Sequence, residues 1–257
     1  MQTTLSRRWG AGYFQAAYTF SKALDATSTG NTAFNTAFND ESDIRNSYGL
    51  SDFDRPHRLS VSYRYDLPFL SKGTGFAHKV LGNWAISGIT TFQSGTPFSV
   101  LDATAGSAFV ANGLAFETLG GTLAPGRTVA SANTSGDIHN RLNQYLDRSA
   151  FVNAPVADPV GCAIDPANAC TLAFGNLRRN LYRGPFQQNW DFSLIKNFAI
   201  TERQQLRFTA DFFNIWNHAN FASPAIAQQD INNPNFAQIT STTGNPRLIQ
   251  LSLRYAF

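Results

Sequence analysis

The last eleven residues of the chain alternate between apolar and polar positions almost without a break. Successive side chains of a β-strand point to opposite faces, so this pattern predicts a strand with one apolar and one polar face. The apolar face must be covered by an apolar environment, because a chain end that packs against nothing frays in water. The apolar positions are Ile249, Leu251, Leu253, Tyr255 and Phe257, and the polar-side positions are Gln250, Ser252, Arg254 and Ala256.

The same alternation recurs upstream and predicts six further strands. The clearest of them is Arg55–Asp66, in which apolar and polar residues alternate over the whole segment. Leu81–Gln93 is the least regular, because Ile89 and Thr90 interrupt the pattern. The remaining predicted strands are Leu5–Arg8, Gly12–Ser21, Asn189–Phe198 and Gln205–Asn217.

The connections between these strands alternate strictly between short and long. The short ones are Trp9-Gly10, Phe69–Gly75 and Ala199–Gln204, and the long ones are Lys22–Asp54, Gly95–Pro185 and His218–Pro246. Outer-membrane barrels have short periplasmic turns and long extracellular loops, with the C-terminus on the periplasmic side. The predicted fold is therefore all-β: an antiparallel transmembrane β-barrel segment of about seven meander strands, incomplete as a barrel.

Composition supports a membrane wall made of strands. Charged residues make up only 14% of the chain, although hydrophobic residues make up 43%. No apolar run approaches the roughly 18 residues that a transmembrane helix requires. In a barrel strand only every second residue faces lipid, so a membrane protein can have few charges and still lack long apolar runs. The 22 phenylalanines recur near the ends of alternating segments, where interfacial aromatic girdles lie. The alternative is a soluble β-sandwich with an aromatic core.

The charged residues that fall on the polar side of the predicted strands are candidates for a polar barrel lumen, which accepts charge where lipid does not. They either hydrogen-bond a plug or substrate, or simply solvate the wall and pair with one another. These lumen-facing candidates are Arg58, Arg64, Asp66, Asp191, Arg207, Asp211 and Arg254.

Other features of the sequence argue against catalysis and against nucleic-acid binding. The net charge is +3 without a basic patch, so nucleic acid is not an expected partner. Asp54-Arg55-Pro56-His57 holds an acid and a base, but Pro56 at the start of a strand favours a structural role. No Ser, His and acid set has a distinguishing spacing, so no catalytic residue, metal site or cofactor is expected. Cys162 and Cys170 predict a local disulfide in an oxidising compartment.

Several short motifs, taken in order, resemble the C-terminal barrel of a TonB-dependent receptor, in particular the Oar-like group. The motifs span nearly the whole chain: Tyr18–Lys22, Asp54–Arg58, Gly82–Trp84, Ser94–Phe98, Asn189–Lys196, Phe212–His218 and the terminal Phe257, with Leu251, Leu253 and Tyr255 completing the closing strand. This resemblance implies location in the outer membrane of a Gram-negative cell.

The resemblance also implies a barrel of about 22 strands around a globular plug, driven from the inner membrane through a TonB box. The implied partners are outer-membrane lipid, the remainder of the receptor (plug and N-terminal strands), the barrel assembly machinery, and TonB. The chain departs from this pattern, because it shows no plug and no TonB box, and Met1–Trp9 has no signal-peptide core. Residues 1–257 are therefore expected to be the C-terminal portion of a receptor barrel.

Three functions remain in view at this point. The first is a barrel segment of a receptor for energy-coupled uptake of an unidentified ligand. The second is a structural or adhesive outer-membrane protein that uses the barrel to display extracellular loops. An outer-membrane hydrolase is the third possibility, and it lacks an identifiable nucleophile.

Overall fold

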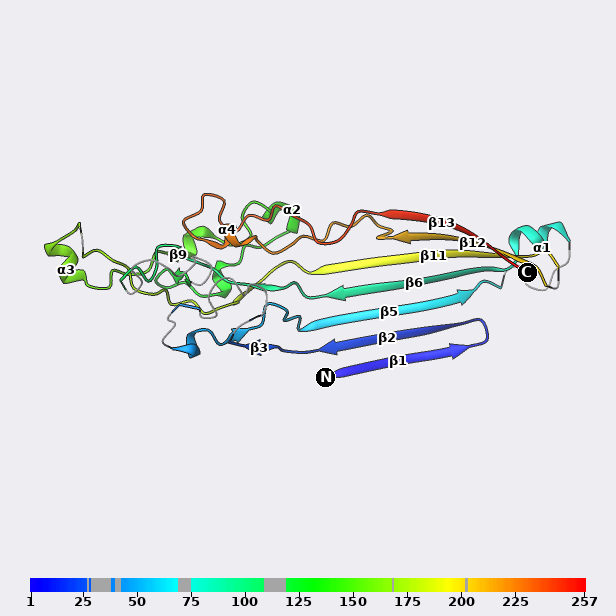
Figure 1. Ribbon diagram of the computed structural model, residues 1–257, viewed down its shortest axis with the longest axis horizontal. Helices are drawn as coiled ribbons and strands as arrows, with labels where there is room; N and C mark the ends of the chain where they lie inside the picture. The colour runs from blue at the N-terminus through cyan, green and yellow to red at the C-terminus, as the bar shows by residue number, and fades with distance from the viewer. Residues whose placement is uncertain are drawn as a thin grey trace.

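The computed structural model describes residues 1–26, 28, 38–39, 43–68, 75–108, 119–167, 169–201 and 203–257. The molecule is elongated, with a long sheet at one end and the long connections gathered at the other (Figure 1). Among the described residues, no helix has both the length and the apolar character needed to cross a membrane.

Seven strands form one antiparallel sheet in sequence order, β1-β2-β5-β6-β11-β12-β13. This confirms the predicted meander, and the sheet is open, with β1 and β13 as its edges. Some boundaries were wrong: Leu81 ends helix α1 (Phe76–Leu81), so that strand begins at Trp84, and the strand predicted for Gln205–Asn217 ends at Phe213. The strands are β1 (Gln2–Trp9), β2 (Gly12–Phe20), β5 (His57–Asp66), β6 (Trp84–Gln93), β11 (Gln187–Ala199), β12 (Gln205–Phe213) and β13 (Leu248–Ala256).

The predicted alternation of connections holds in the structure. The short connections between β1 and β2 and between β11 and β12 lie at one end of the sheet, where the C-terminus also lies (Figure 1). The connection between β5 and β6 reaches the same end and contains α1, although residues 69–74 of the predicted turn lie outside the described part. The long connections 21–56, 94–186 and 214–247 all emerge at the opposite end, called the loop end below.

Short elements occupy the long connections. The described residues of these connections include three two-residue strand pairs. The pairs are β3 (Leu24–Asp25) with β4 (Gly49–Leu50), β7 (Pro97–Phe98) with β10 (Tyr182–Arg183), and β8 (Thr122–Leu123) with β9 (Phe151–Val152). The helices are α2 (Ile138–Arg141), α3 (Pro159–Ile164) and α4 (Ile226–Gln229), with 3₁₀ turns η1 (Ile44–Asn46), η3 (Ala130–Ala132) and η4 (Arg148–Ala150).

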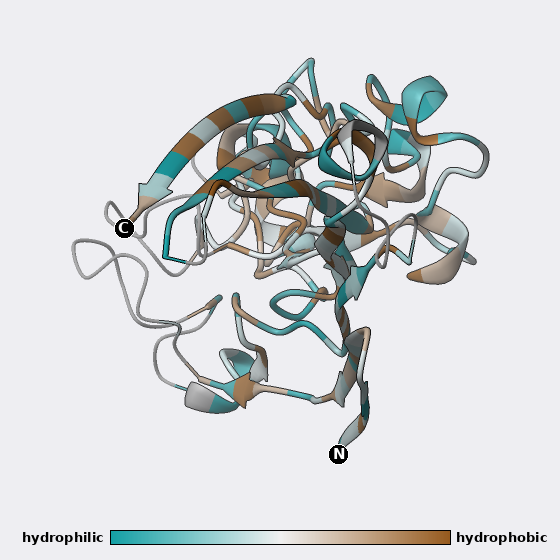
Figure 2. Cartoon of the chain, turned by 90° about the vertical axis from the view of Figure 1, so that its right-hand side faces the viewer, coloured by the Kyte–Doolittle hydropathy of each residue, from teal (hydrophilic) through white to brown (hydrophobic). Residues whose placement is uncertain are grey.

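The main hydrophobic core lies in the connections and not against the sheet. Its buried residues, including Leu146, Phe151 and Phe236, all come from 94–186 and 214–247. These two connections together are called the loop cap. By contrast, every residue of the edge strands β1 and β13 is exposed. Apolar residues alternate with polar ones along the strand that leads to the C-terminus, leaving a two-faced surface (Figure 2).

Candidate functional site

The strand register gathers the polar positions on one face of the sheet. Arg64 is paired with Ser87, Ser87 with Ser193, and Ser193 with Asp211, which makes one polar row across four strands. Directly paired residues share a face, and the faces alternate at every residue. The register therefore places all seven candidate charges on this polar face: Arg58, Arg64, Asp66, Asp191, Arg207, Asp211 and Arg254.

These charges do not converge on one point. Arg64 forms an ion pair with Asp66 at 3.2 Å, and Asp211 accepts a hydrogen bond from Ser193 at 2.5 Å. Arg207 donates to Asn197 at 2.9 Å and lies directly opposite Arg254. The side chains are thus distributed along this face, and Arg64, Arg207 and Asp211 are held by near neighbours.

The opposite face is apolar and carries aromatic groups at both ends. At the loop end, the Phe92 and Trp190 rings meet edge to face, with their centroids 5.4 Å apart. The Trp216 and Trp190 ring centroids are 6.5 Å apart. At the turn end, Trp9 lies 6.4 Å from Tyr65 between ring centroids. Leu251, Leu253 and Tyr255 of the closing strand lie on this face by register, and Phe257 follows the strand. An apolar band between two aromatic girdles is the outer surface of a membrane barrel.

Lys196 is the one basic side chain of β11 on the apolar face, and it is 1% exposed. Its ammonium group donates to the carbonyl of Gly82 in the turn region and lies 5.4 Å and 4.9 Å from the Trp84 and Phe198 ring centroids. A lysine that bends back toward an interface in this way keeps its charge off the apolar band. The sequence pattern gave no sign of this arrangement.

The irregular strand has a physical basis. Register places Ile89 on the polar face, 52% exposed, and Thr90 on the apolar face, 3% exposed. Phe213 and Leu248, also on the polar face, are paired and are 42% and 55% exposed. Ile89 is paired with Asp191, whose carboxylate accepts from the backbone N–H of Asn214, the residue after Phe213. Ile89, Phe213 and Leu248 therefore form an apolar ledge around Asp191.

Asp54 and Arg55 both take part in contacts between the long connections. The Asp54 carboxylate is 2% exposed and accepts from the Ala23 backbone at 2.7 Å and from Arg183 at 2.6 Å. Arg55 donates to the Ser94 carbonyl at 2.7 Å. Burial, together with Arg58 and Arg183, lowers the pKa of Arg55 from its ordinary value. The motif thus fastens connection 21–56 to connection 94–186.

Asn214 links three strands at the loop end. It has a positive φ of 49°, a conformation that asparagine tolerates better than most residues. Its side chain donates to the carbonyls of His218 at 3.0 Å and Asn245 at 3.1 Å, and it accepts from the His218 backbone at 2.9 Å. With its bond to Asp191, Asn214 ties the ends of β11 and β12 to the approach of β13.

A pocket of about 340 Å³ opens beside these contacts, at the loop end of the polar face. Gln187, 8% exposed, organises it: its carbonyl oxygen accepts from Arg55 and from Gln93, both at 2.9 Å, and its amide donates to Thr243 at 3.0 Å. Arg58 pairs with Gln93 in register but does not line the pocket. The lining comprises Arg55, Thr91, Gln93, Gln187, Gln188, Asn189, Asn220, Thr243, Gly244 and Asn245.

Sequence reasoning missed this pocket, because its lining residues are separated by up to 190 positions along the chain. The available signal was the amide side chains Gln93, Gln187 and Asn189, which lie on the polar face at the loop ends of β6 and β11. A second hollow, of about 560 Å³, is lined by cap residues alone, among them Asn143, Arg148 and Pro234. Within the described residues, no group of three His, Cys, Asp or Glu side chains is arranged to hold a metal ion.

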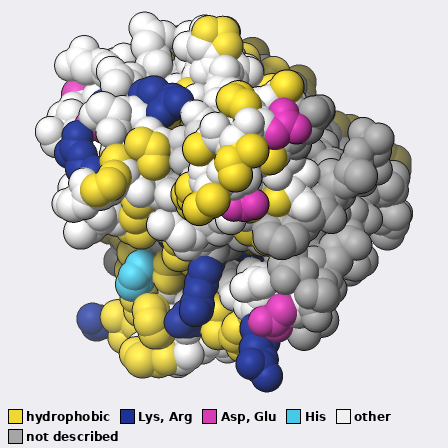
Figure 3. Space-filling model, turned by 90° about the vertical axis from the view of Figure 1, so that its left-hand side faces the viewer, with side chains coloured by type: hydrophobic (Ala, Val, Ile, Leu, Met, Phe, Trp, Pro, Cys, Tyr) yellow, Lys and Arg dark blue, Asp and Glu magenta, His cyan; other side chains and the backbone are white. Residues whose placement is uncertain are grey.

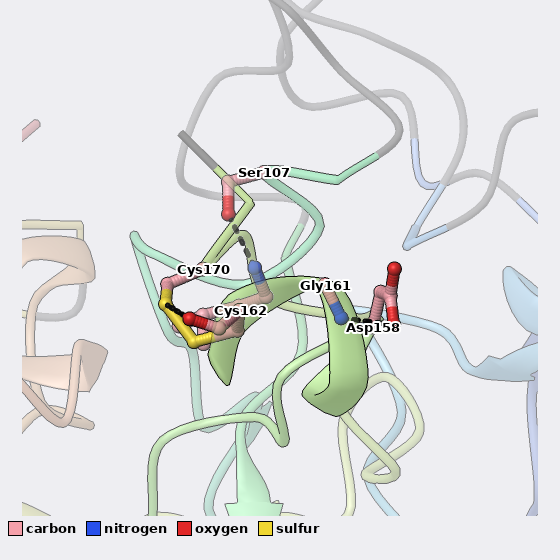
Figure 4. The surroundings of a disulfide bond; sticks show 6 residues. Ser107, Asp158, Gly161, Cys162 and Cys170 are labelled. Carbon is pink, nitrogen blue, oxygen red and sulfur yellow. Dashed lines mark hydrogen bonds between the residues drawn. A yellow bond between two sulfur atoms is a disulfide. The ribbon is translucent and has the colours of Figure 1, made fainter. Parts of the chain in front are cut away.

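Cys162 and Cys170 form a disulfide with Cα atoms 4.5 Å apart (Figure 4). Cys162 lies in α3, whose first turn is capped by Asp158 accepting from the Gly161 backbone at 2.9 Å. Beyond the disulfide, Leu172 donates to the Ser107 hydroxyl at 2.7 Å. The disulfide thus pins the tip of the loop cap, at the end farthest from the sheet (Figure 1).

Charged side chains are dispersed over the described surface of the loop end (Figure 3). On the visible described surface, basic and acidic side chains are scattered among apolar and uncharged ones (Figure 3).

A two-faced antiparallel sheet with aromatic girdles and long connections at one end defines the wall of a membrane β-barrel. Residues 1–250 match the family described as an outer membrane beta barrel domain. The chain belongs to this family, and its location is the outer membrane. Comparison with curated proteins and with solved structures finds no significant match.

Proposed function

We propose that the chain is part of the barrel wall of a TonB-dependent receptor of the Oar-like group, which takes up a ligand with energy from the inner membrane. The observation that carries the proposal is the pocket between the polar face and the long connections. A ligand captured at the loop end meets this pocket before it meets the rest of the polar face, as an uptake path requires.

In this proposal each part of the chain has a mechanical role. The apolar face contacts lipid, the polar face lines the lumen, and the loop cap faces the outside. Further strands and a plug complete the receptor beside the open edges β1 and β13. The barrel assembly machinery inserts the closing strand, and TonB acts on the plug. The chain binds and guides its ligand, and it catalyses no reaction.

Display of the loop cap is a second candidate function, and a specific observation favours it. The cap has its own core, in which Leu146, Phe151 and Phe236 are at most 6% exposed, and a disulfide at its tip. A cap that packs independently of the sheet is suited to presenting a fixed surface to other cells or matrices.

The two functions differ in their dependence on TonB. The full gene product is purified from outer membranes in detergent and titrated with the purified periplasmic domain of TonB. We expect saturable binding that a synthetic TonB-box peptide displaces, and none by a porin purified in the same way. If the full gene product binds no more TonB than the porin does, uptake is excluded and display is favoured.

A further inference from the structure

We propose that the pocket at the loop end of the polar face binds a neutral saccharide of one or two rings. The inference rests on the capture role proposed above and adds the chemical class of the ligand. It is carried by the chemistry of the lining, by the hydrogen-bonding groups left unused there, and by the apolar ledge.

The pocket lining offers uncharged groups that both donate and accept hydrogen bonds. Six of its ten residues are asparagine or glutamine and two are threonine. Carboxamides and hydroxyls match sugar hydroxyls, which also donate and accept. Among these described lining residues there is neither a carboxylate for a cationic ligand nor an apolar side chain.

The one cation of the described lining is engaged through one of its nitrogens. The Arg55 guanidinium donates to the Ser94 carbonyl at 2.7 Å and to Gln187 at 2.9 Å through the same nitrogen. A carboxylate or phosphate would find this single cation as its only charged partner among the described lining residues. The other side chains of the lining are six carboxamides and two hydroxyls, so the lining favours a neutral ligand.

Hydrogen-bonding capacity remains for a ligand. Within the described part of the chain, the Thr91 hydroxyl and the Asn245 side chain make no hydrogen bond. Neither belongs to the buried polar groups that lack a partner, so both are open to a ligand. Asn189 uses its amide nitrogen on Asp191 at 2.8 Å, which leaves its carbonyl oxygen to accept. A buried polar ligand is held selectively when each of its groups finds such a partner.

The apolar ledge supplies the remaining element. Asn189 precedes Asp191 by two residues on the same face, so the ledge of Ile89, Phe213 and Leu248 adjoins the pocket. The exposed Phe213 ring offers a flat apolar surface to the C–H face of a sugar, whose rim of hydroxyls is left for the carboxamides.

The size of the pocket limits the ligand. Its volume of about 340 Å³ is near the lower end of ligand sites, which span roughly 300–1,000 Å³. One or two sugar rings fit such a space. A short peptide also carries amides, but its cationic amino end would need a carboxylate, which the described lining does not provide.

The test uses the full gene product in detergent and isothermal titration calorimetry. Cellobiose and N,N′-diacetylchitobiose are the neutral probes, and citrate and Ala-Ala are the charged probes. Thr91→Val keeps the side-chain shape and removes the hydroxyl, and Asn245→Ala removes an exposed carboxamide. Thr209→Val is the matched control, because Thr209 lies on the same face outside the pocket.

We expect one neutral disaccharide to bind and each pocket variant to weaken it about tenfold, the effect of losing one good hydrogen bond. Thr209→Val should bind as the wild type does. Phe213→Leu, which alters no hydrogen bond of the pocket, should also weaken binding, and it serves if a polar variant fails to fold.

The inference is overturned if no neutral disaccharide binds, if binding is the same in all variants, or if the pocket variants weaken citrate or Ala-Ala instead. Its failure is separate from that of the proposed function. Saccharide binding without TonB binding would exclude uptake and leave the pocket assignment standing. TonB binding without saccharide binding would do the reverse.

Discussion

Arg183 and Asp54 form an ion pair at 2.6 Å, although 129 positions separate them in the sequence. The same guanidinium donates to the carbonyls of Asp54 and Gly95, each at 2.9 Å. The pair joins the first two long connections where they leave the sheet. Because the Asp54 carboxylate is 2% exposed, it depends on this partner.

Arg183→Ala should loosen the junction between these connections. Removing one partner of a buried pair leaves the other charge uncompensated, at a cost of about 3–5 kcal/mol. We expect hydrogen exchange in residues 94–108 and 177–186 to accelerate accordingly. Arg45→Ala is the control, since Arg45 is exposed and 4.0 Å from Asp43, and should change little. Unchanged exchange in Arg183→Ala would show that the pair is not what fastens the cap.

Asp102 should make the loop cap sensitive to acid. Burial by itself would raise the pKa of this fully buried carboxyl, but hydrogen bonds from Thr104, Ala154 and Asn232 outweigh burial and lower it below its ordinary value. A group with a lowered folded pKa stabilises above its unfolded pKa, near 4, and loses that contribution as the pH falls further.

Thermal unfolding of the wild type, followed by calorimetry, should therefore show a loss of stability as the pH falls from about 5 toward 2 that is smaller in Asp102→Asn. Asp43→Asn, at an exposed position, should follow the wild type. An equal loss in Asp102→Asn and the wild type would contradict this role for Asp102.

The disulfide should stabilise only the tip of the cap. It closes a short loop, with a sequence separation of 8, so the chain-entropy gain is about 2–3 kcal/mol. We expect Cys162→Ser with Cys170→Ser to open segment 159–170 to proteases while the sheet keeps its thermal stability. Protease sites distributed over the whole cap would instead mean that the disulfide holds the cap core together.

The two faces of β13 should respond oppositely to charge. Leu251→Arg places a cation on the apolar face near mid-strand, where it costs about 2–4 kcal/mol in lipid. Ser252→Arg, one residue further, places the same group on the polar face and should be tolerated. Urea unfolding of protein folded into lipid vesicles measures the difference. Equal stability of the two variants would contradict the assignment of faces.

The sheet was predictable because each strand carries its own signal. Period-two alternation depends only on neighbouring residues, and it located the seven strands and the sidedness of Arg64 and Asp211 without the structure. The start of β6 was misplaced because α1 precedes it, and Leu81 fits either pattern. Lys196 escaped notice because its position depends on the turn that supplies Gly82.

The pocket was not predictable, because it is made by distant segments. Arg55, Gln187 and Thr243 come from three different parts of the chain and meet only when the long connections fold. Their hydrogen bonds depend on how the connections fold in space. Asn, Gln and Thr at such separated positions form no periodic pattern in the sequence. The Asp54–Arg183 pair is of the same kind.

The central claim is that the sheet is a barrel wall with lipid on one face and lumen on the other. Nitroxide labels along the inner strand β5, read by electron paramagnetic resonance in lipid vesicles, test it directly, and the native cysteines are already paired. We predict strong relaxation by oxygen, which concentrates in lipid, at Leu59, Val61 and Tyr63, and by aqueous nickel complexes at Ser60, Ser62 and Arg64. The same relaxation at all six positions, or the opposite alternation, would contradict the account.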